Sequence, residues 1–211
     1  MTPYALYLPA ALLGYLLGCS TLAWFLAKAK GVDIRGKGSG NPGASNAMIL
    51  MGWKAGILVA LHDIGKAALA VFLAQSLFPS LPLAGETAGA ACVLGHLYPF
   101  YLGFRGGKGF ASYLGMTAVL NWRFALVIGL AIIVLVLITD YMVVGTMTTV
   151  VTFPVYTLLT RHFVAAALLA LTSLFIIWKH RENFRRILDG TEIGLRKAHR
   201  GDLRENKEKE N

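Results

Sequence analysis

Two glycine-rich segments of this chain combine a permissive backbone with positive charge. They are RGKGSGNPGASN at residues 35–46 and GFRGGKGF at residues 103–110. Glycine exposes amide N–H groups and tolerates positive φ, and a helix predicted to begin at Phe110 would add the positive end of its dipole. A third polar segment, KHRENFRRILDGTE at residues 179–192, adds Lys, Arg and Asn side chains. Such groups are suited to binding phosphate; the alternative is that the glycines only form turns and the cations only set topology.

Nucleotide-binding and metal-binding patterns are not met. GVDIRGKG at residues 31–38 approaches a P-loop, but Gly38 stands where a Ser or Thr would bind magnesium. GKGSG lacks the strand–turn–helix setting of a dinucleotide site. The histidines are scattered without paired ligand spacing, so we expect neither a metal nor a cofactor.

The composition predicts an all-α integral membrane protein. The chain has 211 residues, is 56% hydrophobic and has a mean hydropathy of +0.60. A span needs about 20 mostly apolar residues, and we predict seven spans, roughly at residues 4–27, 55–78, 84–102, 110–120, 124–139, 141–160 and 162–178. Asp140 favours a turn between the fifth and sixth spans, because a charge at the bilayer midplane is costly.

The polar ends divide the chain further. We expect a polytopic membrane domain over residues 1–179 that carries the site, and a cytoplasmic juxtamembrane segment over 180–199 that contains the third polar segment. Residues 200–211 are charged and lack apolar anchors, so a disordered tail is expected there.

The cations set the expected orientation. The formal net charge is +9, and most Lys and Arg residues fall on one side of the predicted spans, with only Arg123 and Arg161 on the other and Lys66 within a span. The positive-inside rule then predicts an N-terminus outside the cell and a C-terminus in the cytoplasm, with all three polar segments on the cytoplasmic face. The basic balance points to anionic lipid surfaces and anionic substrates; nucleic acid is not expected, because no basic segment outside the tail is interleaved with aromatic residues.

Three segments together resemble a known family. GSGNPGASN, GHLYPFYLGFRGGKGFAS and HRENFRRILDGTE are similar, in order and spacing, to the three signature motifs of bacterial acyl-phosphate:glycerol-3-phosphate acyltransferases of the PlsY type. The resemblance implies transfer of a fatty acyl group from acyl phosphate to the 1-hydroxyl of sn-glycerol 3-phosphate, giving lysophosphatidic acid and phosphate in phospholipid biosynthesis. It also implies a multi-pass protein of the bacterial cytoplasmic (inner) membrane, with its active site facing the cytoplasm, and the acyl-phosphate-producing enzyme as a candidate partner.

The resemblance also assigns roles to residues. The implied catalytic residues are Ser39, Asn41, His180 and Asn183. The implied phosphate-binding residues are Gly40, Gly43, Ser45, Asn46, Lys66, Arg105, Gly106, Gly107, Lys108 and Gly109. Supporting roles fall to Asp63, His96, Thr146 and Glu192.

Asp63 and Lys66 are spaced i, i+3 and share a helix face. Burying either charge alone would be costly, so we expect a paired unit that faces the site; a purely structural pair is the alternative. No histidine has an aspartate five positions on, so the histidine–aspartate motif of soluble-type acyltransferases is absent and direct acyl transfer is favoured. The resemblance implies a substrate phosphate oxygen as the base. His96 and His180 remain candidate bases, and His96 is alternatively a residue that shapes a helix end.

Two positions depart from the family pattern. Ile49 stands where the family usually has an arginine, and Asp140, in TDYMVVGT at residues 139–146, also replaces an arginine. Because of these changes, a diverged non-catalytic relative of the family that binds lipid phosphates is one alternative interpretation. A small anion transporter is the other alternative, but it should show inverted repeats or a broken helix in the membrane, and neither is evident in the sequence.

Overall fold

The structure is a computed structural model that describes residues 3–196. The predicted tail at 200–211 and the last residues of the predicted juxtamembrane segment lie outside the described residues. Within that range the chain is helical and contains no strand, which confirms the all-α prediction. Its elements are η1 (Pro3–Tyr7), α1 (Leu8–Cys19), α2 (Leu22–Ala29), α3 (Ala44–Met51), α4 (Trp53–Leu77), α5 (Ala84–Leu97), η2 (Phe100–Leu102), α6 (Phe110–Leu120), α7 (Trp122–Thr139), α8 (Met142–Leu159), α9 (Phe163–Lys179) and α10 (Arg181–Leu188).

Several of these helices are long and apolar enough to cross a membrane. By length and composition they are Ala5–Ala29, Trp53–Leu77, Trp122–Thr139 and Met142–Leu159. A fifth is added if α9 and α10, which meet at a bend of 46°, form one span. α5 and α6 are shorter, with 14 and 11 residues.

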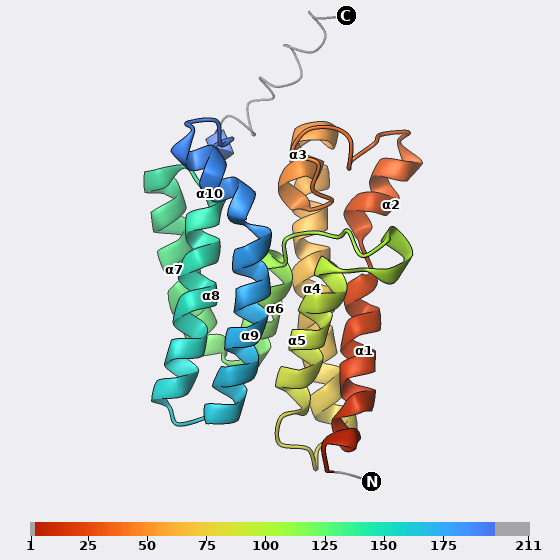
Figure 1. Ribbon diagram of the computed structural model, residues 1–211, viewed down its shortest axis with the longest axis vertical. Helices are drawn as coiled ribbons and strands as arrows, with labels where there is room; N and C mark the ends of the chain where they lie inside the picture. Colours follow the sequence, from red (N-terminus) through yellow and green to blue (C-terminus); the bar gives the residue numbers. More distant parts are fainter. Residues whose placement is uncertain (1–2, 197–211) are drawn as a thin grey trace, which may run out of the picture.

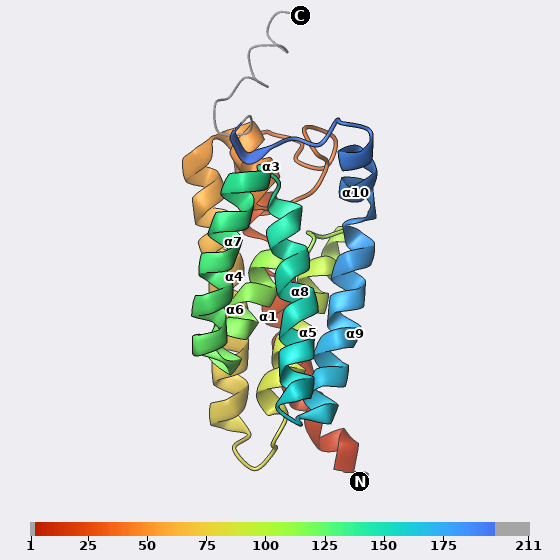
Figure 2. The ribbon, with the colours of Figure 1, turned by 90° about the vertical axis from the view of Figure 1, so that its left-hand side faces the viewer.

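The helices form an elongated bundle (Figures 1 and 2). α1, α4 and α5 pack together, α8 packs between α7 and α9, and α6 joins the two groups through its contacts with α4 and α7. The N-terminus lies at one end of the bundle, whereas α2, α3 and α10 lie at the opposite end (Figure 1). The three polar segments therefore approach the same half of the molecule.

Glycine allows α1 and α5 to approach closely. A Cβ atom added at Gly14 would lie 2.0 Å from the carbonyl oxygen of Ala88, and one at Gly18 would lie 2.1 Å from that of Cys92. The spacing of Gly14 and Gly18 is the small-xxx-small pattern of membrane helix pairs, in which backbone contact replaces a hydrophobic driving force.

The apolar side chains are divided between the inside and the outside of the bundle. Tyr113, Met116 and Leu169 are fully or almost fully buried where α6 meets α9 and its neighbours. The outer face of α7 is apolar as well, with Leu130 61% and Ile138 74% exposed. An apolar exterior of this kind is the surface that lipid covers.

The first predicted span is broken. α1 ends at Cys19, Ser20 is extended and Thr21 is also non-helical, and α2 begins at Leu22. The segment Ala5–Ala29 as a whole is still long and apolar enough to form one span. The freed carbonyl groups find donors within the chain: Cys19 O accepts a hydrogen bond from Tyr101 Oη at 2.7 Å, and Ser20 O accepts one from Lys66 Nζ at 2.7 Å.

Helix boundaries differ from prediction at two further places. α5 ends at Leu97, five residues before the predicted end of its span. α3 was not predicted, because a segment of eight residues beginning inside a glycine-rich motif has no long apolar pattern. It ends at Met51, and the following Gly52 has a φ of +90°, which is accessible to glycine and turns the chain into α4. The turn predicted at Asp140 is confirmed, since this residue has φ +65° between α7 and α8.

We predict that Gly14→Val lowers thermal stability strongly, by at least the roughly 1–3 kcal/mol of an overpacked core, because the added atoms meet the backbone of α5. Gly65→Ala is the matched control, since a Cβ at this glycine of α4 meets nothing within 4 Å. The measurement is the unfolding temperature of the purified protein in detergent. Equal unfolding temperatures for Gly14→Val and Gly65→Ala would contradict the close α1–α5 contact.

Candidate active site

A cavity of about 680 Å³ lies in the half of the bundle that carries α3 and α10. Part of its wall is apolar and comes from α4, α6 and α7, where Ile57, Ile64, Leu114, Ile132 and Ile133 line it. The remaining wall is formed by residues 38–49, the start of α6, the start of α8 and residues 180–195. A cavity of this size with a few convergent polar groups is typical of a small-molecule site.

The cavity brings together residues of all three motifs. The predicted site residues that line it are Ser39, Asn41, Gly43, Ser45, Asp63, His96, Lys108, Gly109, Thr146, His180, Asn183 and Glu192. Those that do not line it are Gly40, Asn46, Lys66, Arg105, Gly106 and Gly107.

A continuous polar chain links the second and third motifs. Lys108 Nζ donates a hydrogen bond to Asn183 Oδ1. Asn183 Nδ2 donates to one carboxylate oxygen of Glu192 at 2.5 Å, and Arg186 Nε donates to the other at 2.6 Å. Glu192 therefore positions both Asn183 and Arg186, which lie one turn apart on α10.

The charges in this series of hydrogen-bonded side chains favour the binding of an anion in the cavity. Burial, together with the positive charge of Arg186, lowers the pKa of Lys108 to about 8, although Glu192 opposes the shift. Arg186 pairs with Glu192, whereas Lys108 is linked to this carboxylate only through Asn183, so an anion entering the cavity would gain two charge-assisted donors. A bound anion would also raise the pKa of Lys108 and keep its ammonium form.

Arg186 is a cavity residue that the sequence reasoning did not select. The Lys and Arg side chains of the third segment are expected as a group to suit phosphate, and Arg186 is not singled out among them. Its position three residues after Asn183 was the available signal, because residues three apart share a helix face. Ile49 lines the same cavity, so Arg186 supplies a guanidinium there although the arginine usual at position 49 is missing.

The GGKG turn is built differently from expectation. The amide of Gly106 donates to Leu97 O at 3.0 Å and that of Gly107 donates to His96 O at 3.0 Å. These amides satisfy carbonyl groups at the end of α5, which would otherwise lack partners. Glycine is required for close approach, since a Cβ at Gly106 would lie 2.1 Å from His96 O.

The first motif is shaped by a buried asparagine. Asn46 is fully buried, and its Nδ2 donates to Ile34 O at 2.8 Å and to Lys37 O at 3.1 Å. Its Oδ1 accepts from the amide of Ser39 at 2.9 Å. Asn46 thus holds the loop that carries Ser39 and Asn41 to the cavity wall.

Of the other predicted positions, Gly40 and Arg105 lie away from the cavity wall, whereas Thr146 is part of it. Gly40 has φ +69° in the turn of the first motif. Arg105 is exposed in the loop before the GGKG turn. Thr146 is buried at the cavity, and its hydroxyl donates to Met142 O at 3.1 Å.

Asp140 does not line the cavity. Its Oδ1 accepts from the amide of Arg196 at 3.0 Å and lies 3.9 Å from Arg196 Nε, and its carbonyl oxygen accepts from the amide of Leu195 at 2.9 Å. Residues 192, 193 and 195 in turn line the cavity. The carboxylate that departs from the family pattern therefore anchors a segment of the cavity wall.

Solved structures define the class of protein. A crystal structure described as PlsY (YgiH), an integral membrane glycerol 3-phosphate acyltransferase, in its glycerol 3-phosphate form, matches with a TM-score of 0.83 and 33% identity over 90% of this chain and 95% of that one. The lysophosphatidic acid form matches with a TM-score of 0.79 and 33% identity over 89% and 94%. The chain is an all-α integral membrane protein of this fold, as predicted.

Sequence relatives define the family. The family model described as glycerol-3-phosphate acyltransferase matches residues 8–190. Glycerol-3-phosphate acyltransferase 1 of Oceanobacillus iheyensis is 38% identical over 201 residues, which cover 90% of this chain and 95% of that protein. Glycerol-3-phosphate acyltransferase of Thermus thermophilus is 40% identical over 190 residues, which cover 87% and 92%. The chain belongs to the glycerol-3-phosphate acyltransferase family; the predicted resemblance is confirmed, and the chain is an acyltransferase of phospholipid synthesis.

We predict that Asp140→Gly loosens residues 190–196. Glycine tolerates the positive φ of this position, so the main loss is the carboxylate that holds Arg196. Amide hydrogen exchange in this segment should accelerate about tenfold, as expected for losing a hydrogen bond to a charged group.

Asp189→Gly is the control for this experiment. Its carboxylate is exposed and lies 3.8 Å from Arg185 Nε, an arrangement that contributes little. Unchanged exchange in Asp140→Gly, or equal acceleration in both variants, would show that Asp140 does not anchor the segment.

Proposed function

We propose that this chain transfers a fatty acyl group from an acyl phosphate directly to the 1-hydroxyl of sn-glycerol 3-phosphate, releasing lysophosphatidic acid and inorganic phosphate. The observation that carries the proposal is the joint position of Lys108, Asn183 and Arg186 beside an apolar wall in one cavity. Both substrates carry phosphate, and the donor also carries an acyl chain that needs an apolar surface. The names of the relatives and the two ligand forms of the PlsY structure support the acceptor and the product.

We assign separate roles to the residues of the polar wall. Lys108 and Arg186 bind the phosphate of glycerol 3-phosphate, and Asn183, held by Glu192, fixes the orientation of Lys108. Ser39 and Asn41 hold the donor phosphate or the developing oxyanion. Gly43, Ser45, Gly109 and Thr146 complete the wall, while Gly40, Asn46, Lys66, Arg105, Gly106 and Gly107 hold the loops and helix ends in place.

His180 offers a hydrogen-bond acceptor to the hydroxyl group of glycerol 3-phosphate. Its Nδ1 is 2.8 Å from Ile176 O, and a carbonyl oxygen only accepts, so Nδ1 carries the ring proton and Nε2 keeps a lone pair. A substrate hydroxyl that donates to Nε2 would be held with its oxygen directed at the donor carbonyl. Such positioning contributes to the rate without an acyl-enzyme.

The chemical step needs no further reactant. The 1-hydroxyl oxygen attacks the carbonyl carbon of the acyl phosphate and forms the ester bond, while the bond from that carbon to the phosphate oxygen breaks. The hydroxyl proton passes by way of His180 Nε2 to an oxygen of the departing phosphate, which is released as inorganic phosphate. Cationic and amide donors stabilise the negative charge that develops in between.

We also propose the membrane arrangement. Helical segments occupy all seven predicted span positions, with α1 and α2 together forming the first, and the distribution of Lys and Arg supports an N-terminus outside and a C-terminus in the cytoplasm. The cavity then lies on the cytoplasmic side of a bacterial inner membrane, where water-soluble glycerol 3-phosphate can reach it. The enzyme that makes acyl phosphate is the expected partner.

The first test supplies purified protein with palmitoyl phosphate and glycerol 3-phosphate. We expect lysophosphatidic acid and phosphate in equal amounts, and Lys108→Ala should raise the KM for glycerol 3-phosphate at least about tenfold, the value of a lost charge-assisted hydrogen bond. Lys54→Ala is the control, because Lys54 is exposed and does not line the cavity.

Other outcomes of this assay point elsewhere. Product from acyl-CoA alone would contradict the acyl phosphate donor. No product from folded protein with any donor would favour the non-catalytic relative, and electrogenic phosphate uptake into vesicles would favour the anion transporter.

The Lys108 pKa of about 8 predicts a pH dependence. The ammonium form binds phosphate and is lost as the pH rises through 8, so kcat/KM for glycerol 3-phosphate should fall about tenfold per pH unit above that value. Lys108→Arg stays protonated in this range, and its profile should be flat there even if its activity is lower. A fall above pH 8 that persists in Lys108→Arg would assign the titration to another group.

A further inference from the structure

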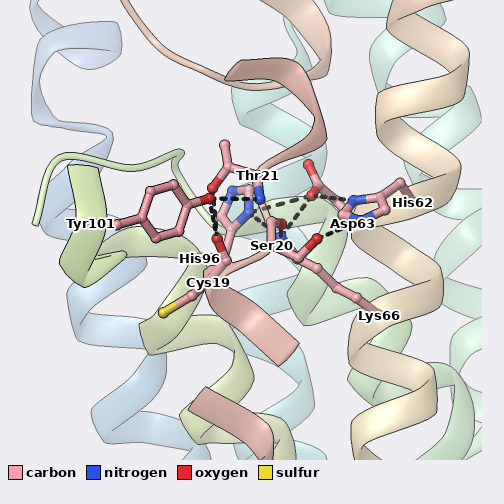
Figure 3. A network of polar contacts seen from close by, with 8 residues as sticks. All are labelled: Cys19, Ser20, Thr21, His62, Asp63, Lys66, His96 and Tyr101. Carbon is pink, nitrogen blue, oxygen red and sulfur yellow. Dashed lines mark hydrogen bonds and ion pairs between the residues drawn. The ribbon is translucent and has the colours of Figure 1, made fainter. Parts of the chain in front are cut away.

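A buried polar network lies beside the cavity, where α4 meets the break after α1 and the end of α5 (Figure 3). Lys66 Nζ is 2.8 Å from Asp63 Oδ1, 2.7 Å from Ser20 O and 2.9 Å from His96 Nδ1. His62 is joined to the same network through Asp63 Oδ1 at 3.4 Å and Ser20 Oγ at 2.9 Å. Asp63 and His96 line the cavity, whereas Lys66 lies behind them.

Lys66 is an ammonium ion in this setting. The side chains of Lys66 and Asp63 are each only 4% exposed. A carboxylate buried in this way keeps its negative charge when a cation pairs with it. An ammonium group has three donors and no acceptor. Its three donors match the three atoms around it: Asp63 Oδ1, Ser20 O and His96 Nδ1.

The ammonium determines the ring state of His96. A donor at 2.9 Å requires a lone pair on Nδ1, and a proton there would place two donors against each other beside a positive charge. Nδ1 is 3.5 Å from Asp63 Oδ1, a long distance for a competing hydrogen bond. His96 is therefore neutral, with its proton on Nε2.

The Nε2 edge of His96 is kept open by glycine. A Cβ atom added at Gly107 would lie 2.1 Å from Nε2. Gly107 precedes Lys108, whose side chain lines the same cavity. His96 is 4% exposed overall, and among the described residues Nε2 has no hydrogen-bond partner. An N–H group at the cavity wall without a protein partner favours a ligand that accepts a hydrogen bond.

We propose that His96 is a fixed hydrogen-bond donor of the active site, whose Nε2–H group binds an anionic oxygen of a bound phosphate-bearing substrate or of the developing oxyanion. Lys66, held by Asp63 and Ser20 O, is the positioning residue that sets this polarity. His96 therefore does not serve as the general base. The inference rests on the proposed function for its catalytic consequence, but the ring state of His96 stands apart from any activity.

The second cavity histidine has the opposite polarity. His180 donates from Nδ1 to Ile176 O and keeps its lone pair on Nε2. One histidine thus offers a donor and the other an acceptor to the same cavity. This contrast matches the chemistry, because a phosphate or oxyanion needs a donor and an attacking hydroxyl needs an acceptor.

The ring states are measured directly by NMR of the full-length protein labelled with ¹⁵N-histidine in detergent. We expect the His96 signals to show an unprotonated Nδ1 and a protonated Nε2, and the His180 signals, assigned with His180→Gln, to show the reverse. Adding inorganic phosphate or glycerol 3-phosphate should shift the His96 Nε2–H signal. Protonated Nδ1 on His96, or an Nε2–H signal insensitive to both ligands, would overturn the proposal whatever the enzyme activity.

Kinetics of a matched pair of variants test the catalytic consequence. His96→Gln keeps an N–H donor at the end of the side chain, whereas His96→Met has a similar length and no donor. We expect kcat/KM within about tenfold of the wild type for His96→Gln and a loss of roughly 100-fold or more for His96→Met, the cost of one oxyanion donor. The shape of the pH profile should not change in His96→Gln.

Two results would contradict this role. Equal large losses in both folded variants, with the acid limb of the pH profile removed, would make His96 a base. Equal small losses would make it structural. If His96→Met does not fold, the Lys66→Met variant is used instead. Without the ammonium group, the NMR spectrum should show the His96 ring in a mixture of protonation states.

Discussion

The Lys66 ammonium is the constraint on which the centre of this molecule depends. A charge buried between helices is tolerated only when all its donors are matched, and here the partners come from three separate elements. Asp63 lies one turn away on α4, Ser20 O becomes available because the helix breaks after α1, and His96 lies at the end of α5. The break in the first span thus supplies one of the acceptors that a buried lysine needs.

The end of α5 carries the second part of the architecture. Its last carbonyl groups accept hydrogen bonds from the amides of Gly106 and Gly107, which folds the glycine-rich turn back against the helix. This return brings Lys108 to the cavity, where α10 meets it with Asn183 and Arg186. The glycines therefore shape the cavity indirectly: they allow the backbone to approach α5 closely enough for the lysine beside them to line the cavity.

The departures from the family pattern have local explanations. Asp140 faces the segment that ends at Arg196, and this contact secures one wall of the cavity. Ile49 faces the cavity, and Arg186 supplies a guanidinium within it. Neither substitution removes the positive charge at the cavity, because Arg186 on α10 and Lys108 in the turn before α6 supply it.

The sequence by itself determined the membrane class, the all-helical fold, the positions of the long helices and the three motifs that meet at the cavity, because apolar length and residue type are local properties. The pairing of Asp63 with Lys66 was also readable, since i, i+3 spacing places two side chains on one face. Only the tertiary structure decided that α1 breaks at Ser20, that Arg186 enters the site and that the Gly106 and Gly107 amides cap α5. It also decided which ring nitrogen of each cavity histidine carries the proton. These properties depend on partners distant in sequence, and hydrogen-bond polarity at a buried site is set by the neighbours that folding brings there.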